Sequence, residues 1–282
     1  MINNIELPKA LKVLCSNYQV EEDTEGESPT EVFKLTKKSE TLYLKIGHQK
    51  LANTTYSIDR EKAVMLWLAE KIRVPKILGY WESDNHQFLL MTKLEGESLS
   101  EKQEADPDAF VDAFAEAIQQ LQAIMIDDCP FDSGLDVRLR ELKYLMDNDV
   151  AAYDDFVAGE LPFSDAEGLY QHLLADEESR LPFRNPEELY QHLIETKFLE
   201  HKVFSHGDMS DGNILIDAQG RIEFIDWGRG GCADTWCDIA HAARNIRAEL
   251  GEESQVQRFF KKLKIEEDRQ KIMYHLLLDQ LF

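Results

Sequence analysis

Alternating hydrophobic and polar positions indicate β-strands in the first third of the chain. The segments EVFKLT (31–36) and TLYLKI (41–46) both alternate, and the polar residues KKSE separate them. Since successive side chains of a strand point to opposite faces, this pattern predicts a β-hairpin. VPKILGYWE and HQFLLMTKL are typical of two further strands in the same region.

A helical period follows the hairpin. In REKAVMLWLAEKI the apolar residues recur at helical intervals, and we expect a helix from Asp59, as its N-terminal cap, to about Ile72. After LEG (94–96) the helical period dominates. The clearest helix is predicted to have Asp106 as its cap and Pro107 in its first position. Its apolar stripe comprises Phe110, Phe114, Ile118, Leu121 and Met125.

These patterns predict an α+β fold with two lobes. We expect an N-lobe over residues 1–95, formed by an antiparallel sheet with one helix. A mainly helical C-lobe is expected over residues 96–282. A chain of this length fits one large domain or two lobes with a shared core.

The C-lobe contains an internal repeat. LPFSDAEGLYQHL recurs after 20 residues as LPFRNPEELYQHL, with nine of thirteen positions identical. Because a solenoid needs about three or more units, we interpret 161–180 and 181–200 as a tandem duplication. In the second copy Asn185 and Pro186 predict a helix start. The first copy is expected to be an insertion at the surface.

The chain is strongly acidic. It has 54 Asp and Glu against 31 Lys and Arg, a net charge of −23. Nucleic acids and anionic membranes bind through basic patches, so neither is an expected partner. The charge would attract a polycation, although by itself it is more typical of a merely soluble surface.

Nothing in the chain indicates export or a membrane. No apolar run approaches the length of about 20 residues that a membrane helix needs, and the first residues lack the pattern of a signal peptide. The four cysteines have no zinc or redox spacing, which favours a reducing compartment. We therefore expect a cytoplasmic protein.

The strongest chemical motif is VFSHGDMSDGNILIDAQGRIEFIDWGR (203–229). Asn213 follows Asp208 by five residues, and Asp226 follows a predicted hairpin and precedes Trp-Gly. Kinases use this arrangement: one Asp accepts the hydroxyl proton, and the Asn and a second Asp hold Mg²⁺ at the phosphates of ATP. The alternative is that these acids are ordinary turn residues, which would not explain the hairpin and the second motif behind them.

Residues in the first lobe complete this pattern. Alternation places Tyr43 and Lys45 on one face of their strand, where they suit base stacking and phosphate charge. Glu61 lies on the apolar stripe of the next helix, where a buried acid needs a partner, and Lys45 is the candidate. Alone, Glu61 would be interpreted as an acid favoured at a helix start. In the loop before the hairpin, Ser28 is a candidate phosphate donor, although a single glycine there is too few for a glycine-rich loop.

Several stretches together resemble one enzyme family. HGDMSDGN, FIDWGRGGCADTWCDIAHAARNIR, TTYSIDREKAVMLWL, DTEGESP and the final LLLDQLF resemble bacterial aminoglycoside 3′-phosphotransferases, most closely the type III enzymes of Gram-positive bacteria. The resemblance covers nearly the whole chain except the extra repeat. It implies a protein-kinase-like fold that uses ATP and Mg²⁺.

The resemblance also implies a role for each motif residue. Asp208 would be the catalytic base, and Asn213 and Asp226 would hold two Mg²⁺ ions. The residues that would contact the nucleotide, or orient one that does, are Ser28, Tyr43, Lys45, Glu61 and the backbone of Thr92 and Leu94. The residues that would bind the drug are Asp154, Asp155, Glu160, Arg229, Glu249, Asp279 and the Phe282 carboxylate. Ala248 and Gln280 depart from the family pattern, which has acids there.

The sequence thus predicts ATP- and Mg²⁺-dependent phosphorylation of an aminoglycoside hydroxyl, the 3′-hydroxyl by resemblance, which confers resistance. Two alternatives stay open: a kinase for another cationic or hydroxylated metabolite, similar to choline kinases, and a nucleotide-binding regulator without turnover. The choice between ATP and GTP, the drug spectrum and the oligomeric state stay open as well.

Overall fold

The computed structural model describes residues 5–24, 29–102, 106–148, 165–175 and 180–282. The chain forms two compact units. The first comprises Met1–Glu95 and Glu223–Arg229, and the second comprises Gly96–Ile222 and Gly230–Phe282. The short segment 223–229 therefore belongs to the first unit although it comes much later in the chain.

The first unit is built on a five-stranded antiparallel sheet of order β1-β2-β3-β5-β4. Its elements are α1 (Lys9–Cys15), β1 (Gln19–Asp23), β2 (Glu31–Lys37), β3 (Glu40–His48), η1 (Gln49–Leu51), α2 (Ile58–Leu68), β4 (Ile77–Glu82) and β5 (His86–Thr92). The four predicted strands and the hairpin are confirmed. The structure adds the helix α1 and the strand β1, which lacks buried residues and so gave no alternation to detect.

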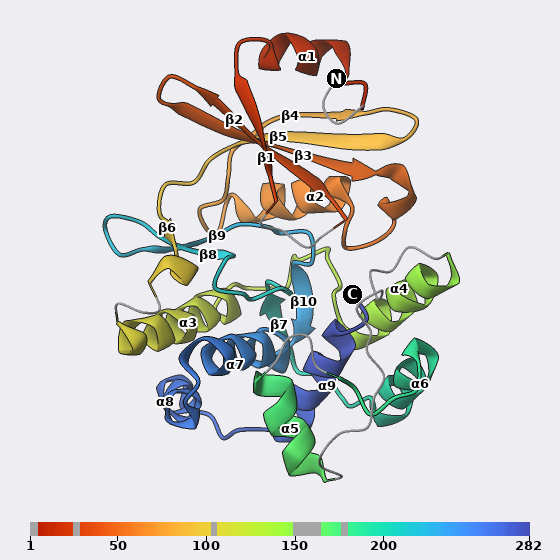
Figure 1. Cartoon of the computed structure of the whole chain (residues 1–282), viewed down its shortest axis with the longest axis vertical. Coiled ribbons are helices and arrows are strands. Elements are labelled where there is room, and N and C mark those ends of the chain that lie inside the picture. Colours follow the sequence, from red (N-terminus) through yellow and green to blue (C-terminus); the bar gives the residue numbers. More distant parts are fainter. Residues whose placement is uncertain (1–4, 25–28, 103–105, 149–164, 176–179) are drawn as a thin grey trace. The chain divides into compact units, whose positions relative to one another are not determined.

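The two faces of this sheet have different covers. Helix α1 packs its buried Leu11 against one face, in a core that includes Leu42, Leu44 and Ile46 of β3. Helix α2 contacts β3 and β5 on the opposite face, as Figure 1 shows. Because side chains alternate along β3, Lys45 points toward α2.

Helix α2 differs at both ends from its prediction. Ser57, not Asp59, caps the helix, because the Ser57 hydroxyl accepts a hydrogen bond from the Arg60 N–H at 3.4 Å. Asp59 lies inside the first turn, where its charge suits the helix N-terminus. The helix ends at Leu68 rather than Ile72, because two later N–H groups converge on the Leu68 carbonyl in a tight turn.

The second unit is mainly helical. Its elements are β6 (Glu97–Ser98), η2 (Leu99–Glu101), α3 (Pro107–Gln122), α4 (Leu135–Asp147), α5 (Ala166–Ala175), α6 (Pro186–Thr196), β7 (Lys202–Ser205), β8 (Ile214–Ile216), β9 (Ile222–Phe224, shared with the first unit), β10 (Gly231–Asp234), α7 (Trp236–Leu250), α8 (Glu253–Leu263) and α9 (Arg269–Asp279). Helix α7 packs against α3, α5, α8 and α9, and β7 pairs with β10 (Figure 1). Among the described residues, no helix has both the length and the apolar composition that crossing a membrane requires.

Helix α3 largely matches its prediction. The Asp106 carboxylate accepts a hydrogen bond from the Ala109 N–H at 3.0 Å, and Pro107 occupies the first helical position. The predicted stripe is buried up to Leu121. Met125 is 70% exposed, because the helix ends at Gln122 and its periodicity no longer applies.

Both copies of the repeat fold into helices. Asn185 caps α6 through a 2.9 Å hydrogen bond from the Glu188 N–H, with Pro186 in the first position, as predicted. In the first copy the Asp165 carboxylate accepts from the Gly168 N–H at 2.7 Å, and α5 follows. The glycine therefore does not prevent the helix.

The interpretation of the first copy as a surface insertion is wrong. Tyr170, Leu173 and Leu174 of α5 are at most 2% exposed. Helix α5 packs against α7 and α9, whereas α6 packs against α9. The hydrophobic residues that the duplication preserved give each copy its own buried face.

We predict that α5 contributes as much stability as α6. Leu173 and Leu193 occupy equivalent repeat positions and are 1% and 0% exposed. Each Leu→Ala change should lower the free energy of unfolding by about 2–5 kcal/mol, because it leaves a cavity. Urea unfolding measures this loss. The control is Leu199→Ala, at a 93% exposed position, which should change the free energy of unfolding by less than about 0.5 kcal/mol. A Leu173→Ala effect as small as the control would restore the surface-insertion interpretation.

Candidate active site

A buried lysine connects three segments of the first unit. Lys45 of β3 is 7% exposed. Its ammonium donates to the Glu61 carboxylate of α2 at 2.8 Å and to the Asp226 carboxylate at 2.9 Å. The structure thus brings together three residues that the sequence selected, including the predicted Lys45–Glu61 pair.

The charges of this cluster depend on one another. Burial alone would lower the pKa of Lys45, but the carboxylates of Asp226 and Glu61 outweigh it and hold that pKa above its ordinary value. Burial raises the pKa of Glu61, and the Lys45 ammonium opposes that rise. Lys45 therefore stays charged, and one cation serves two carboxylates.

The backbone at Asp226 has an unusual conformation. Asp226 has a φ of 63°, in the left-handed region that costs a non-glycine residue about 1–3 kcal/mol. Two residues later a Cβ on Gly228 would lie 2.6 Å from the Thr55 carbonyl oxygen, so only glycine fits. This close approach explains the glycine of the Asp-Trp-Gly motif.

Side chains of the first unit hold the segment 223–229. The Arg60 Nε donates to the Gly228 carbonyl at 3.0 Å, and Arg73 pairs with the buried Glu223 at 2.7 Å. Arg229 donates to the Tyr56 hydroxyl at 3.2 Å. The sequence analysis missed Arg60 and Arg73, because no local pattern shows that their partners are so distant in the chain.

The other predicted nucleotide residues lie at the same sheet. Tyr43 shares the Lys45 face of β3. The Thr92 N–H donates to the Lys76 carbonyl at 2.9 Å. Leu94 is 5% exposed just after β5. Ser28 lies outside the described residues.

The second unit holds the HGD loop. Asp208 follows β7, and the Asn213 side-chain amide donates to the Asp208 carbonyl at 2.9 Å and to its carboxylate at 3.2 Å. The predicted pair is therefore adjacent, and Asn213 fixes the direction in which Asp208 points.

Helix α7 holds this loop through two side chains that the sequence analysis missed. The Asp238 carboxylate accepts from the N–H groups of His206 and Gly207, both at 2.8 Å. The Asn245 side chain accepts from the Asp211 N–H at 3.1 Å. Asp238 and Asn245 are seven residues apart on one helix face and both are buried. A polar pair on a buried helical face was the signal that would have found them.

Of the predicted drug-binding residues, Asp279 has the most defined surroundings. Its carboxylate pairs with Arg244 at 3.1 Å, and the His241 Nε2 lies 3.8 Å from it. Burial lowers the pKa of His241 to about 4, so this histidine is neutral at pH 7. Arg244 is therefore a full cationic partner of Asp279, whereas the neutral His241 is not.

The remaining drug-side predictions are dispersed. Phe282 lies just after α9, and Glu249 is exposed near the end of α7, both in the second unit. Arg229 belongs to the first unit. Asp154, Asp155 and Glu160 lie outside the described residues. Among the described residues of the second unit, Asp279 and Phe282 lie in one turn after α9.

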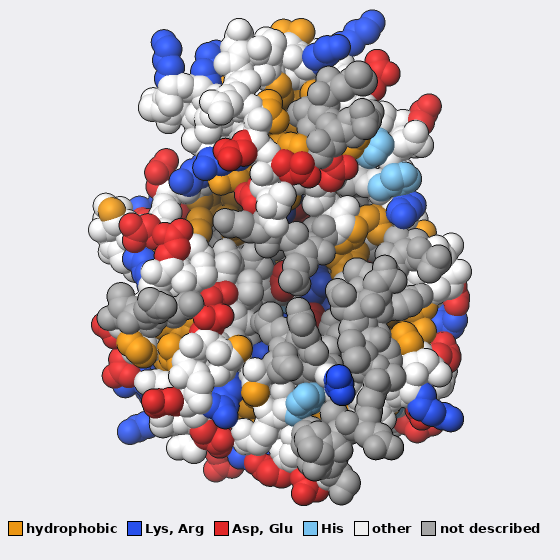
Figure 2. Space-filling view, in the orientation of Figure 1, with side chains coloured by type: hydrophobic (Ala, Val, Ile, Leu, Met, Phe, Trp, Pro, Cys, Tyr) orange, Lys and Arg blue, Asp and Glu red, His pale blue; other side chains and the backbone are white. Residues whose placement is uncertain are grey.

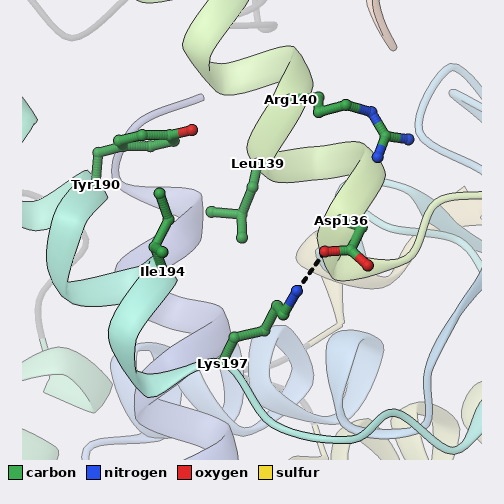
Figure 3. A pocket seen from close by; sticks show the side chains of 6 residues that line it. All are labelled: Asp136, Leu139, Arg140, Tyr190, Ile194 and Lys197. Carbon is green, nitrogen blue, oxygen red and sulfur yellow. Dashed lines mark hydrogen bonds and ion pairs between the residues drawn. The ribbon is translucent and has the colours of Figure 1, made fainter.

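A pocket of about 230 Å³ lies between α4 and α6 (Figure 3). Its lining residues are Asp136, Leu139, Arg140, Tyr190, Ile194 and Lys197, and an ion pair joins Asp136 and Lys197. None of the predicted site residues that the structure describes lines it. We assign it no role in the chemistry.

Acidic side chains are spread over the visible face, with basic ones scattered among them (Figure 2). The described residues of that face show no continuous basic patch. Among the described residues, no group of three or more His, Cys, Asp or Glu side chains is arranged to hold a metal by itself.

Known proteins resemble the chain along nearly its whole length. The family described as "Phosphotransferase enzyme family" matches residues 19–272. An aminoglycoside 3′-phosphotransferase of Enterococcus faecalis is 42% identical over 276 residues, which cover 96% of this chain and 97% of the relative. An aminoglycoside 3′-phosphotransferase of Staphylococcus aureus is 40% identical over 276 residues, which again cover 96% of this chain and 97% of the relative.

Solved structures share the fold. The crystal structure of a type VIII aminoglycoside-3′-phosphotransferase matches with a TM-score of 0.73 at 22% identity, covering 97% of this chain and 98% of that chain. A choline kinase of Streptococcus pneumoniae matches with a TM-score of 0.57 at 15% identity, covering 97% and 87%. The predicted kinase-like fold is therefore confirmed.

We predict that removal of the Lys45 charge destabilises the protein in a pH-dependent way. Lys45→Met leaves Glu61, which is 4% exposed, without its cation, and breaking a buried pair costs about 3–5 kcal/mol. The pKa of Glu61 is then raised further, so the folded variant binds more protons than the unfolded chain. The loss of stability should therefore grow as the pH rises from about 5 to about 8.

Urea unfolding at both pH values measures this loss. Lys143→Met is the control, because its ion pair with Asp147 is exposed and should contribute less than about 1 kcal/mol. Equal effects of the two substitutions, without a pH trend, would contradict the role of Lys45.

Proposed function

Since the chain belongs to the phosphotransferase enzyme family, and within it to the aminoglycoside 3′-phosphotransferases, we propose that it transfers the γ-phosphoryl group of ATP to the 3′-hydroxyl of an aminoglycoside. The modification would confer resistance to the drug. The near-full-length similarity to enzymes of this name carries the proposal. The retained Lys45, Glu61, Asp208, Asn213 and Asp226 favour an active enzyme over a regulator without turnover.

Asp208 is the proposed catalytic base. Its carboxylate accepts the proton of the attacking hydroxyl as the oxygen bonds to phosphorus. The hydrogen bonds from Asn213 keep the carboxylate oriented. Asp238 and Asn245 hold the backbone of the loop from α7, so the base needs little reorganisation.

Asn213 and Asp226 are the proposed Mg²⁺ ligands. Carboxylate and amide oxygens are the hard donors that this ion prefers. Asn213 directs its amide nitrogen to Asp208, which leaves the amide oxygen as the donor to a metal. Asp226 retains a side chain that is 44% exposed beside Lys45. Bound Mg²⁺ would neutralise charge on the phosphate oxygens.

The first unit supplies the proposed nucleotide contacts. Lys45, kept charged by its two carboxylates, would donate to the α- and β-phosphates, and Glu61 would orient it. Tyr43 would stack on the adenine, and the backbone of Thr92 and Leu94 would bind its edge. Ser28 would donate to the β-phosphate.

Acidic side chains are the proposed contacts for the drug amines. Carboxylates form charge-assisted hydrogen bonds with ammonium groups and so orient a polycation. The proposed acidic groups are Asp154, Asp155, Glu160, Glu249, Asp279 and the Phe282 carboxylate. Arg229 is proposed as a further drug contact, but as a cation it would not bind an amine. At Asp279 an ammonium group of the drug would compete with Arg244. The requirement for ATP places the proposed reaction in the cytoplasm.

We expect Asp208→Ala to lower kcat by about 10²–10⁴-fold, because a general base contributes that much. ATP affinity should change little, since Asp208 acts on the acceptor. Steady-state ADP release and equilibrium nucleotide binding test both statements. Asp127→Ala removes an exposed acid of the same unit and is the control. More than about a third of the wild-type kcat would reject Asp208 as the base.

The acceptor position is tested with a matched pair of substrates. An aminoglycoside that carries a 3′-hydroxyl should be phosphorylated, and its 3′-deoxy analogue should give ADP only at the background rate. A simple amino alcohol such as choline tests the alternative metabolite kinase. Equal ADP release with both aminoglycosides would place the acceptor elsewhere, and turnover of choline alone would favour the alternative.

A further inference from the structure

Helix α4 contains a buried arginine that the proposed function leaves unexplained. Arg138 is 3% exposed, and its neighbours on this helix face are the buried Leu135, Leu139 and Leu142. Among the described residues, the Arg138 Nε has no hydrogen-bond partner. Burial of a guanidinium is costly unless another group compensates its charge. A nearby group must therefore compensate the charge of the buried Arg138 guanidinium.

The compensating group is an aromatic ring beyond the end of α9. The guanidinium carbon of Arg138 lies 4.2 Å from the centre of the Phe282 ring. The negative face of an aromatic ring attracts a cation at this distance, and more strongly when water is excluded. Arg138 and Phe282 are far apart in the chain, so this contact fixes the last turn of the protein against α4.

This last turn, Asp279–Phe282, also carries Asp279. The Phe282 N–H donates to the Asp279 carbonyl at 3.1 Å, and Leu281 between them is fully buried. The Asp279 carboxylate pairs with Arg244 of α7. Two arginines thus hold the same turn, Arg138 from α4 through the ring and Arg244 from α7 through the carboxylate.

We propose that Arg138 is a positioning residue for drug binding: by holding the Phe282 ring, it sets the place of the Asp279 carboxylate. The proposal rests on the proposed function, in which Asp279 binds a drug amine. Arg138 itself need not contact the drug, the nucleotide or the reacting atoms. A buried charge that adds little stability can still fix one geometry, which explains an arginine here rather than a leucine.

The consequence is a specific kinetic pattern. A misplacement of about 1 Å in a binding group can cost about a hundredfold in rate or affinity. Arg138→Met keeps an unbranched apolar stem but removes the charge and the guanidinium, so the KM for the drug should rise about tenfold or more. The KM for ATP should change less than about twofold, because lost ground-state binding is confined to the drug.

Three further variants separate positioning from simple packing. Arg138→Lys keeps a cation, so its KM for the drug should lie between those of the wild type and Arg138→Met. Phe282→Leu removes the ring but keeps an apolar side chain, and it should raise the drug KM. Since Arg138 acts through this ring, the double variant should be no worse than the more affected single variant. Arg140→Met, an exposed position of the same helix, is the matched control.

Opposite results overturn the proposal. If the increases in the drug KM of the two single variants multiply in the double variant, Arg138 acts independently of Phe282. An equal rise of both KM values, or a rise that Arg140→Met reproduces, would assign Arg138 a general structural role.

Unfolding measurements separate this proposal from the proposed function. The four proteins of the cycle are unfolded in urea without ligands, where non-additive free energies should reveal the Arg138–Phe282 contact. Additive values would overturn the contact whatever the substrate is. A wild-type enzyme that releases no ADP with any aminoglycoside would instead overturn the proposed function and, with it, the drug-binding role of Arg138.

Discussion

The bond between Lys45 and its two carboxylates is the constraint on which the first unit depends. A lysine that is almost fully buried remains charged only because Glu61 and Asp226 surround it. These partners are 16 and 181 residues away in the chain. The pairing therefore sets the position of α2 on the sheet. It also attaches the segment 223–229 to the first unit.

The second unit holds its loop with hydrogen bonds to backbone N–H groups instead. A loop that presents a base and a metal ligand has backbone N–H groups that need partners. Helix α7 supplies those partners through Asp238 and Asn245. The chemistry proposed for the protein thus uses loop residues, whereas helices and strands determine where those loops lie.

Local patterns predicted the elements well where a pattern was strong. The hairpin strands, the Asp106 cap and the Asn185 cap follow from alternation and capping chemistry within a few residues. The prediction that Asp59 caps α2 was wrong because Ser57 and Asp59 are both good caps, and the choice depends on where the chain leaves the loop. The prediction that Met125 belongs to the buried stripe of α3 was wrong because the helix ends before this residue.

Long-range packing was not predictable from one sequence. The glycine in α5 suggested a weak helix at the surface, but burial of Tyr170 and Leu173 against α7 and α9 outweighs that local cost. Arg60, Asp238 and Arg138 were missed because each acts on a residue distant in the chain. The Lys45–Glu61 pair was found only because the kinase motif elsewhere suggested that a partner was needed.

The most direct test of the central claim is the structure of the product. The protein is incubated with ATP, Mg²⁺ and an aminoglycoside, and phosphorus–proton correlation NMR of the purified product locates the phosphate. The account predicts one phosphate per drug molecule, bonded to the 3′ oxygen, and at least about a hundredfold less product in the same time with Asp208→Ala. A phosphate on another oxygen, or ADP formed without phosphorylated drug, would contradict it.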